Sequence, residues 1–583
     1  MIDETIQSGF NWTLTTLIFS PLMGVAMVLT LHRDDHSRIR LMALLASLTT
    51  LALAVITAFE FRSAAVQTSG NGWALYHLQG DLAWLDPDGP IDVRYHVGVD
   101  TISLWLVLLT AFLTPLAVWA SFSGIRERVR EYFALLLLLE TAMLGVFCSM
   151  DLLLFFVFFE FTLIPLFFII GIWGGAERRR AAAKFFIFTV AGSVLTFGGV
   201  LFVAYYVYSS AVAYGLPDAK FTMSIKDLIA AGRAGRIPAD VQWWLFIAFA
   251  AGFAVKVPFF PLHTWLPLAH TEAPTAGSAI LAGVLLKLGT YGFVRLCVAM
   301  LPDATYAFAP FMAVLAIVGI LYGAFCAWAQ TDVKKLVAYS SVSHLGFCML
   351  GLFSLKLAGA TGSIIYMLNH GLSTAALFLI VGMVYERYHT RDMDKIGGLA
   401  RTMPWMAFFL IFFTLASIGL PGLNGFVGEI LVLLGTAYSD QPRTSPDDLG
   451  VGPLGFAYAI PAALGIIFGA VYMLSMCQKV LFGPRREPPH TPDASTGLTP
   501  DLNGRERAIL FPLAVACLLI GVYPRPLIDS LHPAISVNVF QLYYMPSSTP
   551  HGLELMVDET AAAAPSADTP AIRGNSSILP EPA

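Results

Sequence analysis

The stretch from Gly252 to Lys287 reads GFAVKVPFFPLHTWLPLAHTEAPTAGSAILAGVLLK and places titratable side chains within strongly apolar sequence. Lys256 ends one membrane-like run of residues, and Lys287 lies inside the next run. Proline lacks the amide proton and collides with the preceding helical turn, so the segment between the lysines predicts a broken helix; it contains Pro258, Pro261 and Pro267. A lysine at mid-bilayer costs about 2.5–3.5 kcal/mol, and broken backbone at that depth requires burial in protein or a wet cavity. The stretch therefore predicts an ion path through a membrane.

The composition argues against a soluble protein. The 583 residues are 57% hydrophobic and 13% charged, with a mean hydropathy of +0.71, whereas soluble domains carry about 25% charged residues. The net charge of −5 and the lack of a basic tract argue against nucleic acid as a partner. The six cysteines form no CxxC or Cys/His cluster, and no glycine-rich phosphate motif is present. We therefore expect an all-α polytopic membrane protein with no cofactor or metal site on this chain.

Fourteen apolar runs approach the length of about 20 residues that a membrane-spanning helix needs. They lie near residues 11–31, 39–60, 99–121, 132–149, 152–173, 184–208, 241–260, 276–300, 306–328, 335–355, 361–385, 404–436, 456–481 and 508–528. The fourth and fifth runs are separated only by residues 149–151, which predicts a tight hairpin.

The charges on the connecting loops alternate between the two sides of the membrane. Loops of one parity are rich in arginine and lysine, near residues 33–40, 126–130, 178–180, 334–335, 387–401 and 485–507. The opposite loops are acidic, very short or mixed, and segment 209–240 fits least because it carries four basic residues beside three aspartates. The positive-inside rule therefore predicts that both termini lie on the outer side.

Two of the runs are interrupted. The seventh breaks at KVPFFP and the twelfth at GLPGLNGFVGE, each beside an ionisable residue. Interrupted helices in corresponding halves indicate an inverted-repeat transporter core. The predicted organisation is two helices and an outer loop (1–98), a third helix and cytoplasmic loop (99–131), two repeats (132–303 and 304–483), a cytoplasmic linker (484–507), a last helix with an outer segment (508–544) and a disordered tail rich in Pro, Ala and Ser (545–583).

Three carboxylates lie inside apolar runs, where charge is expensive. Glu160 stands alone in LLLFFVFFEFTLIPLFFII, Glu140 is central in ALLLLLETAMLG, and Glu429 follows the break in the twelfth run. We interpret Glu160 and Glu429 as proton-carrying groups; the alternative for each is a carboxylate that a neighbouring helix holds for packing. For Glu140 both interpretations stay open.

Histidines add groups that titrate near neutral pH. His344 in AYSSVSHLGFCML and His370 in YMLNHGLSTAALF lie on neighbouring runs, so we favour proton transfer over the alternative of satisfied core histidines. His263 and His270 follow the break in the seventh run. They are either residues through which protons arrive from the cytoplasm or simply loop residues.

A lysine beside a glutamate suits a proton path on energetic grounds. At about 4 Å and an effective dielectric constant near 20, such a pair is worth about 4 kcal/mol. Driving one charge against about 180 mV costs about 4 kcal/mol as well. We therefore hypothesise that Glu160 and Lys256 form a pair whose making and breaking moves one proton.

Four motifs within residues 95–485 resemble a known family. They are LLLFFVFFEFTLIPLFFIIGIWGG, AVKVPFFPLHTWLPLAHTEAPTAGSAILAGVLLKLGTYGFVR, TDVKKLVAYSSVSHLGF and LPGLNGFVGE. The chain is similar to the antiporter-like membrane subunits of respiratory complex I, the proton-translocating NADH–quinone oxidoreductase. The resemblance implies about 14 transmembrane helices, in which spans 4–8 and 9–13 form inverted five-helix repeats around broken helices 7 and 12. The long C-terminal tail departs from the family pattern.

The resemblance also implies roles for single residues. By motif match Glu160 is the glutamate of helix 5, Lys256 its partner on helix 7, and Lys287 the central lysine of helix 8. His344 continues the polar axis with His370 beside it. The position of Glu429 on helix 12 separates the sibling subunits, because subunits L and N usually carry a lysine there and the third antiporter-like subunit a glutamate.

The resemblance implies partners as well. Subunits L and N would flank this chain in a bacterial inner membrane, and NADH, FMN, iron–sulfur clusters and quinone would bind other subunits. We expect water to connect the cytoplasm to Lys287 and the periplasm to Glu429. The alternatives are a subunit of an Mrp-type sodium/proton antiporter, which would purify without NADH dehydrogenase subunits, and a structural membrane scaffold, in which neutral replacements of Glu160 and Lys256 would leave pumping intact.

Overall fold

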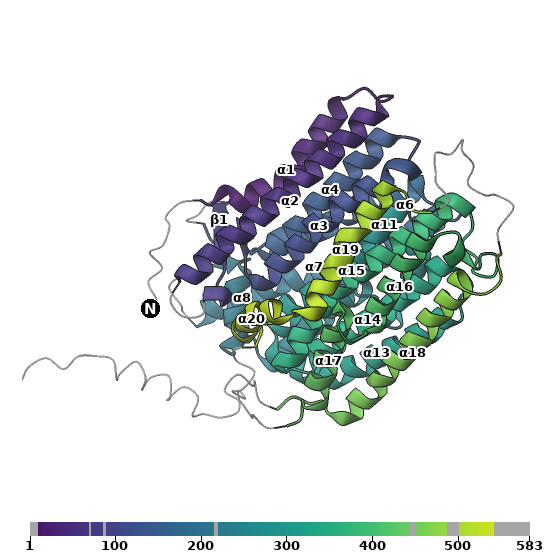
Figure 1. The fold of residues 1–583 in the computed structure, drawn as a ribbon. Coiled ribbons are helices and arrows are strands. Elements are labelled where there is room, and N and C mark those ends of the chain that lie inside the picture. Colours follow the sequence, from purple (N-terminus) through teal and green to yellow (C-terminus); the bar gives the residue numbers. More distant parts are fainter. Residues whose placement is uncertain are drawn as a thin grey trace, which may run out of the picture. The chain divides into compact units, whose positions relative to one another are not determined.

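The computed structural model describes residues 10–68, 72–85, 89–214, 220–441, 451–486 and 501–540. The tail predicted at 545–583, most of the linker predicted at 484–507 and both chain termini lie outside these described residues. Helices dominate the described chain (Figure 1), as the sequence predicts.

Eleven helices in the described ranges are long and apolar enough to cross a membrane, and one bent pair makes a twelfth. They are α1 (Trp12–Thr30), α2 (His36–Gln67), α3 (Thr101–Gly124), α4 (Val129–Cys148), α5 with α6 (Leu152–Phe161 and Leu163–Trp173), α7 (Arg178–Ala213), the composite helix Thr275–Val298, α13 (Pro302–Trp328), α14 (Val333–Phe353), α15 (Leu357–Tyr388), α18 (Phe456–Leu481) and the pair α19 (Gly504–Val522) with α20 and η7 (Arg525–Ala534 and Ile535–Val539).

Two further membrane-length segments are broken helices, as the prolines and glycines predict. The first runs from α9 (Ala239–Lys256) through the turn η2 (Leu262–Trp265) into α10 (Leu266–Glu272). The second consists of α16 (Pro404–Ile418) and α17 (Asn424–Ala437). If each counts as one crossing, the described chain holds the fourteen spans that the sequence predicts. The inverted relation between the two repeats stays a prediction.

The eighth span departs from a regular α-helix. It consists of α11 (Thr275–Ile280), a π turn η3 (Leu281–Leu285), α12 (Leu286–Gly292) and a second π turn η4 (Phe293–Val298). Every residue of its most apolar window is buried inside the protein. Such π turns occur mostly as local interruptions of α-helices, often at functional sites.

A short β region was not predicted from the sequence. Strand β1 (His77–Ala83) pairs antiparallel with β3 (Arg94–Val99), and β2 (Ile91–Asp92) pairs parallel with β4 (Phe221–Thr222). The last three residues of β3, from Val97 to Val99, are all buried, so this end of the strand is covered on both faces. A bridge between Val97 and Ser149 ties this region to the tight α4–α5 turn.

The last described segment, residues 501–540, packs against helices from both the early and the late parts of the chain. In Figure 1 the yellow helix α19 lies over α15 and α16, and it also packs against α17 and α3. Glu506 in its first turn binds Arg387 of α15 through two hydrogen bonds of 2.7 and 2.9 Å. At the other end, Asn538 donates to the carboxylate of Asp100 at 2.9 Å. Both ends of the segment are therefore fixed to the core.

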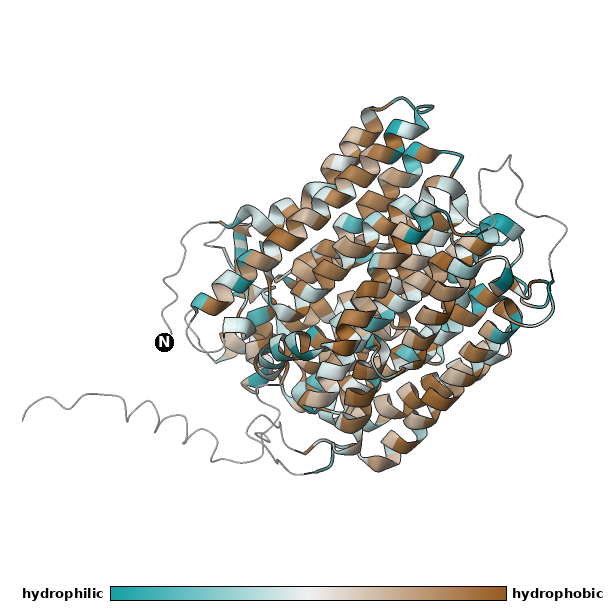
Figure 2. Ribbon diagram, in the orientation of Figure 1, coloured by the Kyte–Doolittle hydropathy of each residue, from teal (hydrophilic) through white to brown (hydrophobic). Residues whose placement is uncertain are grey.

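Hydrophobic residues predominate along the long helices (Figure 2). Many of their large apolar side chains are exposed, including Phe59, Ile187 and Ile467, each more than half exposed. Such surfaces suit contact with lipid tails, so the chain is a multi-pass membrane protein. Short elements complete the described fold: η1 (Gly72–Ala74), α8 (Ile225–Arg233) and η5 (Leu399–Arg401).

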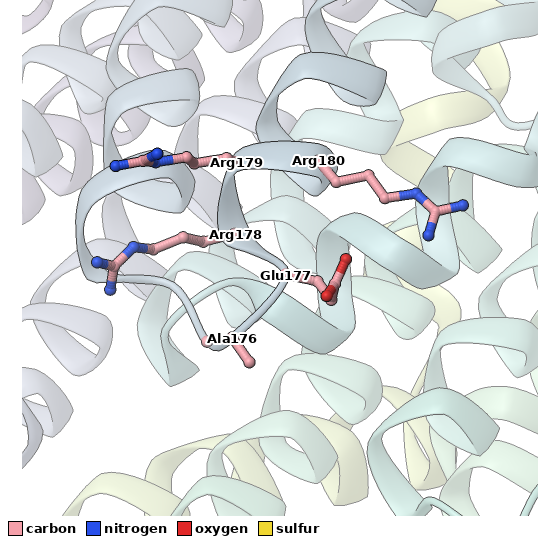
Figure 3. A pocket seen from close by; sticks show the side chains of 6 residues that line it. Ala176, Glu177, Arg178, Arg179 and Arg180 are labelled. Carbon is pink, nitrogen blue, oxygen red and sulfur yellow. The ribbon is translucent and has the colours of Figure 1, made fainter.

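A positively charged hollow opens where α7 begins. It is lined by residues 175–180, and the three arginine side chains Arg178, Arg179 and Arg180 spread apart around it (Figure 3). A carboxylate oxygen of Glu272 accepts a hydrogen bond of 2.9 Å from the backbone of Glu177 at its edge. The hollow belongs to one of the arginine-rich loops that the sequence assigns to the cytoplasmic side.

Candidate functional site

Lys287 occupies the centre of the site and is fully buried on α12. Its Nζ lies 2.6 Å from Nδ1 of His370 on α15 and 2.5 Å from the carbonyl oxygen of Ala282. Ala282 belongs to the π turn η3. The lysine is therefore held between an irregular turn of its own span and a titratable ring on α15.

A second chain of hydrogen bonds reaches Glu429. Nδ1 of His344 on α14 lies 2.6 Å from the hydroxyl of Tyr366 on α15, and that hydroxyl donates to Oε1 of Glu429 on α17 at 2.7 Å. All three side chains are at most 6% exposed. Three different helices thus meet at one phenol group.

The two histidine rings connect these chains. Their centroids lie 5.7 Å apart, and Nε2 of each ring is buried without a hydrogen-bond partner in the protein. The structure therefore brings together four of the site residues that the sequence predicts: Lys287, His370, His344 and Glu429. Together with Tyr366 they form what we call the central axis.

The break in the twelfth span, between α16 and α17, packs closely against residues of this axis. Asn369 and Asn424 exchange amide-to-backbone hydrogen bonds of 2.5 and 3.3 Å, which fix the start of α17 to α15. Gly419 ends α16 with a φ of +79°, and a Cβ there would collide with Oε2 of Glu429. Only glycine satisfies both the left-handed backbone and this close approach.

The Glu160–Lys256 ion pair predicted from the sequence is absent from the described residues. The ammonium group of Lys256 donates instead to the carbonyl of Phe159 at 2.9 Å and to the hydroxyl of Thr162 at 3.3 Å. It also lies 3.5 Å from the ring centroid of Phe159. One carboxylate oxygen of Glu160 is buried without a hydrogen-bond partner. The physical reason is the break between α5 and α6 at Thr162, which offers uncharged oxygen acceptors nearer to the lysine than the carboxylate.

The remaining predicted residues are buried but separate from the hydrogen-bonded axis. Both carboxylate oxygens of Glu140 on α4 and both ring nitrogens of His270 on α10 are buried without partners. The His270 ring stacks on Phe378 at 4.6 Å between centroids. His263 lies in η2, 3% exposed, with its ring 5.2 Å from that of Tyr322. Neither histidine is a loop residue, because both belong to the helical part that follows the break.

Sequence reasoning missed several buried polar groups. Tyr366 lies one helical turn before His370 on α15, and this spacing is the signal that could have found it. Arg295 forms a buried ion pair with Asp100, and Arg387 pairs with Glu506 at 2.7 Å. Arg387 was assigned to a charged loop but is 2% exposed within α15.

Family models cover most of the chain. Residues 149–442 match the model described as NADH:quinone oxidoreductase/Mrp antiporter, TM, and residues 41–147 match NADH-ubiquinone oxidoreductase chain 4, amino terminus. NADH-quinone oxidoreductase subunit M of Rhodobacter capsulatus is 42% identical over 468 residues, covering 80% of this chain and 84% of that protein. The chain belongs to the NADH-quinone oxidoreductase subunit M family. NADH-ubiquinone oxidoreductase chain 4 of Arabidopsis thaliana is 38% identical over 537 residues, or 92% of this chain and 98% of the relative.

Solved structures share the fold of this chain. A chain of respiratory complex I from Thermus thermophilus superposes with a TM-score of 0.74 at 30% identity, covering 91% of this chain and all of that one. A chain of the Mrp complex from Dietzia superposes with a TM-score of 0.73 at 20% identity over 92% of this chain. The second likeness shows a shared fold.

Proposed function

We propose that this chain is a membrane-arm subunit of the proton-pumping NADH:quinone oxidoreductase, and that it conducts protons across the membrane as electrons pass from NADH to quinone. The central axis carries this proposal, because it joins buried titratable groups from both predicted repeats. Charged groups at membrane depth are costly and mark ion pathways and proton relays.

The axis residues act as successive holders of one proton. The ammonium group of Lys287 faces Nδ1 of His370 at 2.6 Å, so it can pass a proton to that ring. His344 and Glu429 lie farther along, and Glu429 delivers the proton toward the periplasm. Protons reach Lys287 from the cytoplasm through water. Because Lys256 is held by uncharged oxygens, its pairing with Glu160 belongs to a different step from the arrangement described here.

The redox chemistry belongs to partner subunits. NADH, FMN, iron–sulfur clusters and quinone bind other chains of the complex, and subunits L and N flank this chain in the bacterial inner membrane. The chain's own contribution to the enzyme is proton translocation. Its arginine-rich loops face the cytoplasm, and both termini lie outside.

Neutral replacements in the assembled complex test this function. Lys287→Ala and Glu429→Gln should each lower NADH-driven proton uptake by inverted membrane vesicles by about 10²-fold, the usual contribution of a positioned proton-transfer group. Oxidation of NADH by an artificial electron acceptor reports assembly and should persist. Lys479→Ala is the matched control, because Lys479 is 43% exposed and forms only a surface ion pair.

Two outcomes would contradict the proposal. If both axis variants pump protons normally in an intact complex, the chain does not conduct protons through this axis and acts as a structural scaffold. Purification of the chain in a complex free of NADH dehydrogenase subunits, with sodium/proton exchange as its activity, would identify an Mrp-type antiporter subunit instead.

A further inference from the structure

Tyr366 is the one tyrosine of the central axis. Its hydroxyl lies between Nδ1 of His344 at 2.6 Å and Oε1 of Glu429 at 2.7 Å. The side chain is 2% exposed, and its ring is packed edge-on to Phe347 at 6.0 Å between centroids. The phenol is therefore held in place at the junction of three helices.

The packing of α17 against α15 brings the hydroxyl into reach. Gly428 lies against the ring of Tyr366, where an added Cβ would be 2.7 Å from Cδ2. The next residue, Glu429, presents its carboxylate to the hydroxyl. Because residue 428 has no side chain, α15 and α17 can lie close together. This short distance lets the side chain of residue 429 reach the hydroxyl.

The chemistry of the three groups fixes the direction of each hydrogen bond. A phenol has one proton and can accept while it donates, whereas an ionised carboxylate only accepts. When the hydroxyl donates to Glu429, Nδ1 of His344 must therefore carry the proton that binds the phenol oxygen. Nε2 of His344 then remains the site that receives a proton from the direction of His370.

We propose that the Tyr366 hydroxyl relays protons from His344 to Glu429, an inference that rests on the proposed function. The Nδ1–H bond of His344 breaks as a new O–H bond forms on the phenol. At the same time the original phenol O–H bond breaks and a new O–H bond forms on Oε1 of Glu429. One proton moves, no electrons are exchanged, and Tyr366 is neutral before and after.

Tyr366→Phe keeps the ring and removes the relaying oxygen. Its NADH-driven proton uptake in inverted vesicles should fall by about 10²-fold, while NADH oxidation by an artificial acceptor shows that the complex is assembled. Tyr132→Phe is the matched control, because Tyr132 is also fully buried and its hydroxyl also binds another side chain, Ser121 at 3.1 Å. This control should pump at the wild-type rate.

Tyr366→Gln separates a relay from a spacer. The amide can accept from His344 and donate to Glu429, but it does not readily exchange one proton for another. The relay predicts that this variant is assembled and as impaired as Tyr366→Phe. Wild-type pumping by either variant would overturn the relay.

The proposed function and the relay fail in different ways. If Lys287→Ala and Glu429→Gln pump normally, the proposed function is wrong and the relay falls with it. If those two variants lose pumping while the Tyr366 variants retain it, protons bypass the phenol and only the relay is wrong.

Discussion

The central axis and the two buried ion pairs at the ends of the last segment, which we call the anchors, are equally buried but differ in their partners. At the anchors, each charge meets an opposite charge: Arg387 binds both carboxylate oxygens of Glu506, and Asp100 meets Arg295. Along the axis, Lys287 meets an imidazole ring and Glu429 meets a phenol, neither of which carries a permanent charge. We therefore infer that a candidate proton carrier is marked by the lack of a permanent counter-charge rather than by burial alone.

This difference has a physical basis. A buried pair of opposite charges holds its protons firmly, because removing one partner leaves an uncompensated charge in a low-dielectric interior. A titratable group bound to a neutral donor or acceptor can change protonation with its hydrogen bonds rearranged. Two buried nitrogens of the axis even lack a hydrogen-bond partner in the protein: Nε2 of His344 and Nε2 of His370. The anchors suit stability, and the axis suits transfer.

The largest expected effect on stability comes from breaking an anchor. Arg387→Met should cost about 3–5 kcal/mol, because Glu506 is left charged and buried. The measurement is the thermal stability of the detergent-solubilised complex and the amount of this subunit retained in it.

Two comparison variants sharpen that result. Arg387→Met combined with Glu506→Gln should recover much of the loss, because the pair is then neutral and glutamine can keep the capping box with Asn503. Arg525→Ala removes an exposed pair with Asp529 and should cost at most about 1 kcal/mol. Equal losses from Arg387→Met and Arg525→Ala would remove the distinction between anchors and surface pairs.

A smaller effect on stability, but a large one on pumping, is expected at the break in the twelfth span. Gly419→Ala and Gly422→Ala each place a side chain on left-handed backbone, at φ of +79° and +91°, and each should cost about 1–2 kcal/mol. Only at Gly419 would the new Cβ displace the carboxylate of Glu429, since nothing lies within 4 Å of a Cβ at Gly422.

Proton uptake by inverted vesicles distinguishes the two glycine variants. Gly419→Ala should lose most of its pumping, whereas Gly422→Ala should pump at nearly the wild-type rate once its lower thermal stability is taken into account. Equal pumping by the two would show that the position of the Glu429 carboxylate has no bearing on transfer.

The smallest expected effect concerns Asp151, a buried carboxylate that meets neither a cation nor a phenol. It accepts hydrogen bonds from the backbone N–H groups of Leu153, Leu154 and Arg94. Burial raises the pKa of Asp151 to about 6. The protonated form is therefore favoured in the folded state, and the resulting stability, fully present below about pH 4, is lost as the pH rises through 6.

Asp151→Asn removes this pH dependence and keeps a good helix cap. The wild-type protein should lose about 1 kcal/mol of local stability between about pH 5 and pH 7 relative to the variant. Amide hydrogen exchange at Leu153 and Leu154 measures it. A wild-type opening free energy that changes with pH in parallel with that of the variant would contradict the raised pKa.

Much of the fold could be predicted from the sequence. The apolar runs predicted the spans, and the prolines and glycines of KVPFFP and GLPGLNGFVGE predicted both broken helices. The short strands were missed because β3 is only six residues long and lies in a polar loop.

Site residues could be predicted where a single ionisable side chain lies in apolar sequence. They could not be predicted where their importance depends on a contact with a residue far away in the sequence. Lys287, His344 and Glu429 stand out because charge is expensive in apolar sequence. Tyr366 does not, because a tyrosine in an apolar run is usually a packing residue. The partners Asp100 and Arg295 are 195 positions apart, and no local pattern joins them. The predicted Glu160–Lys256 ion pair is not formed in the described structure, because the carbonyl of Phe159 and the hydroxyl of Thr162 at a helix break bind the lysine instead.

The π turn beside Lys287 has a consequence for how this span tolerates change. A π turn takes in one residue more than an α-helical turn, whereas one residue removed from a regular α-helix rotates the side chains beyond it by about 100° around the helix axis. Loss of one residue within Leu281–Leu285 would turn this part of the span into a regular α-helix and leave Lys287 facing the same side. A single-codon deletion there would therefore remove the irregular turn beside the lysine without turning the lysine away from its neighbours.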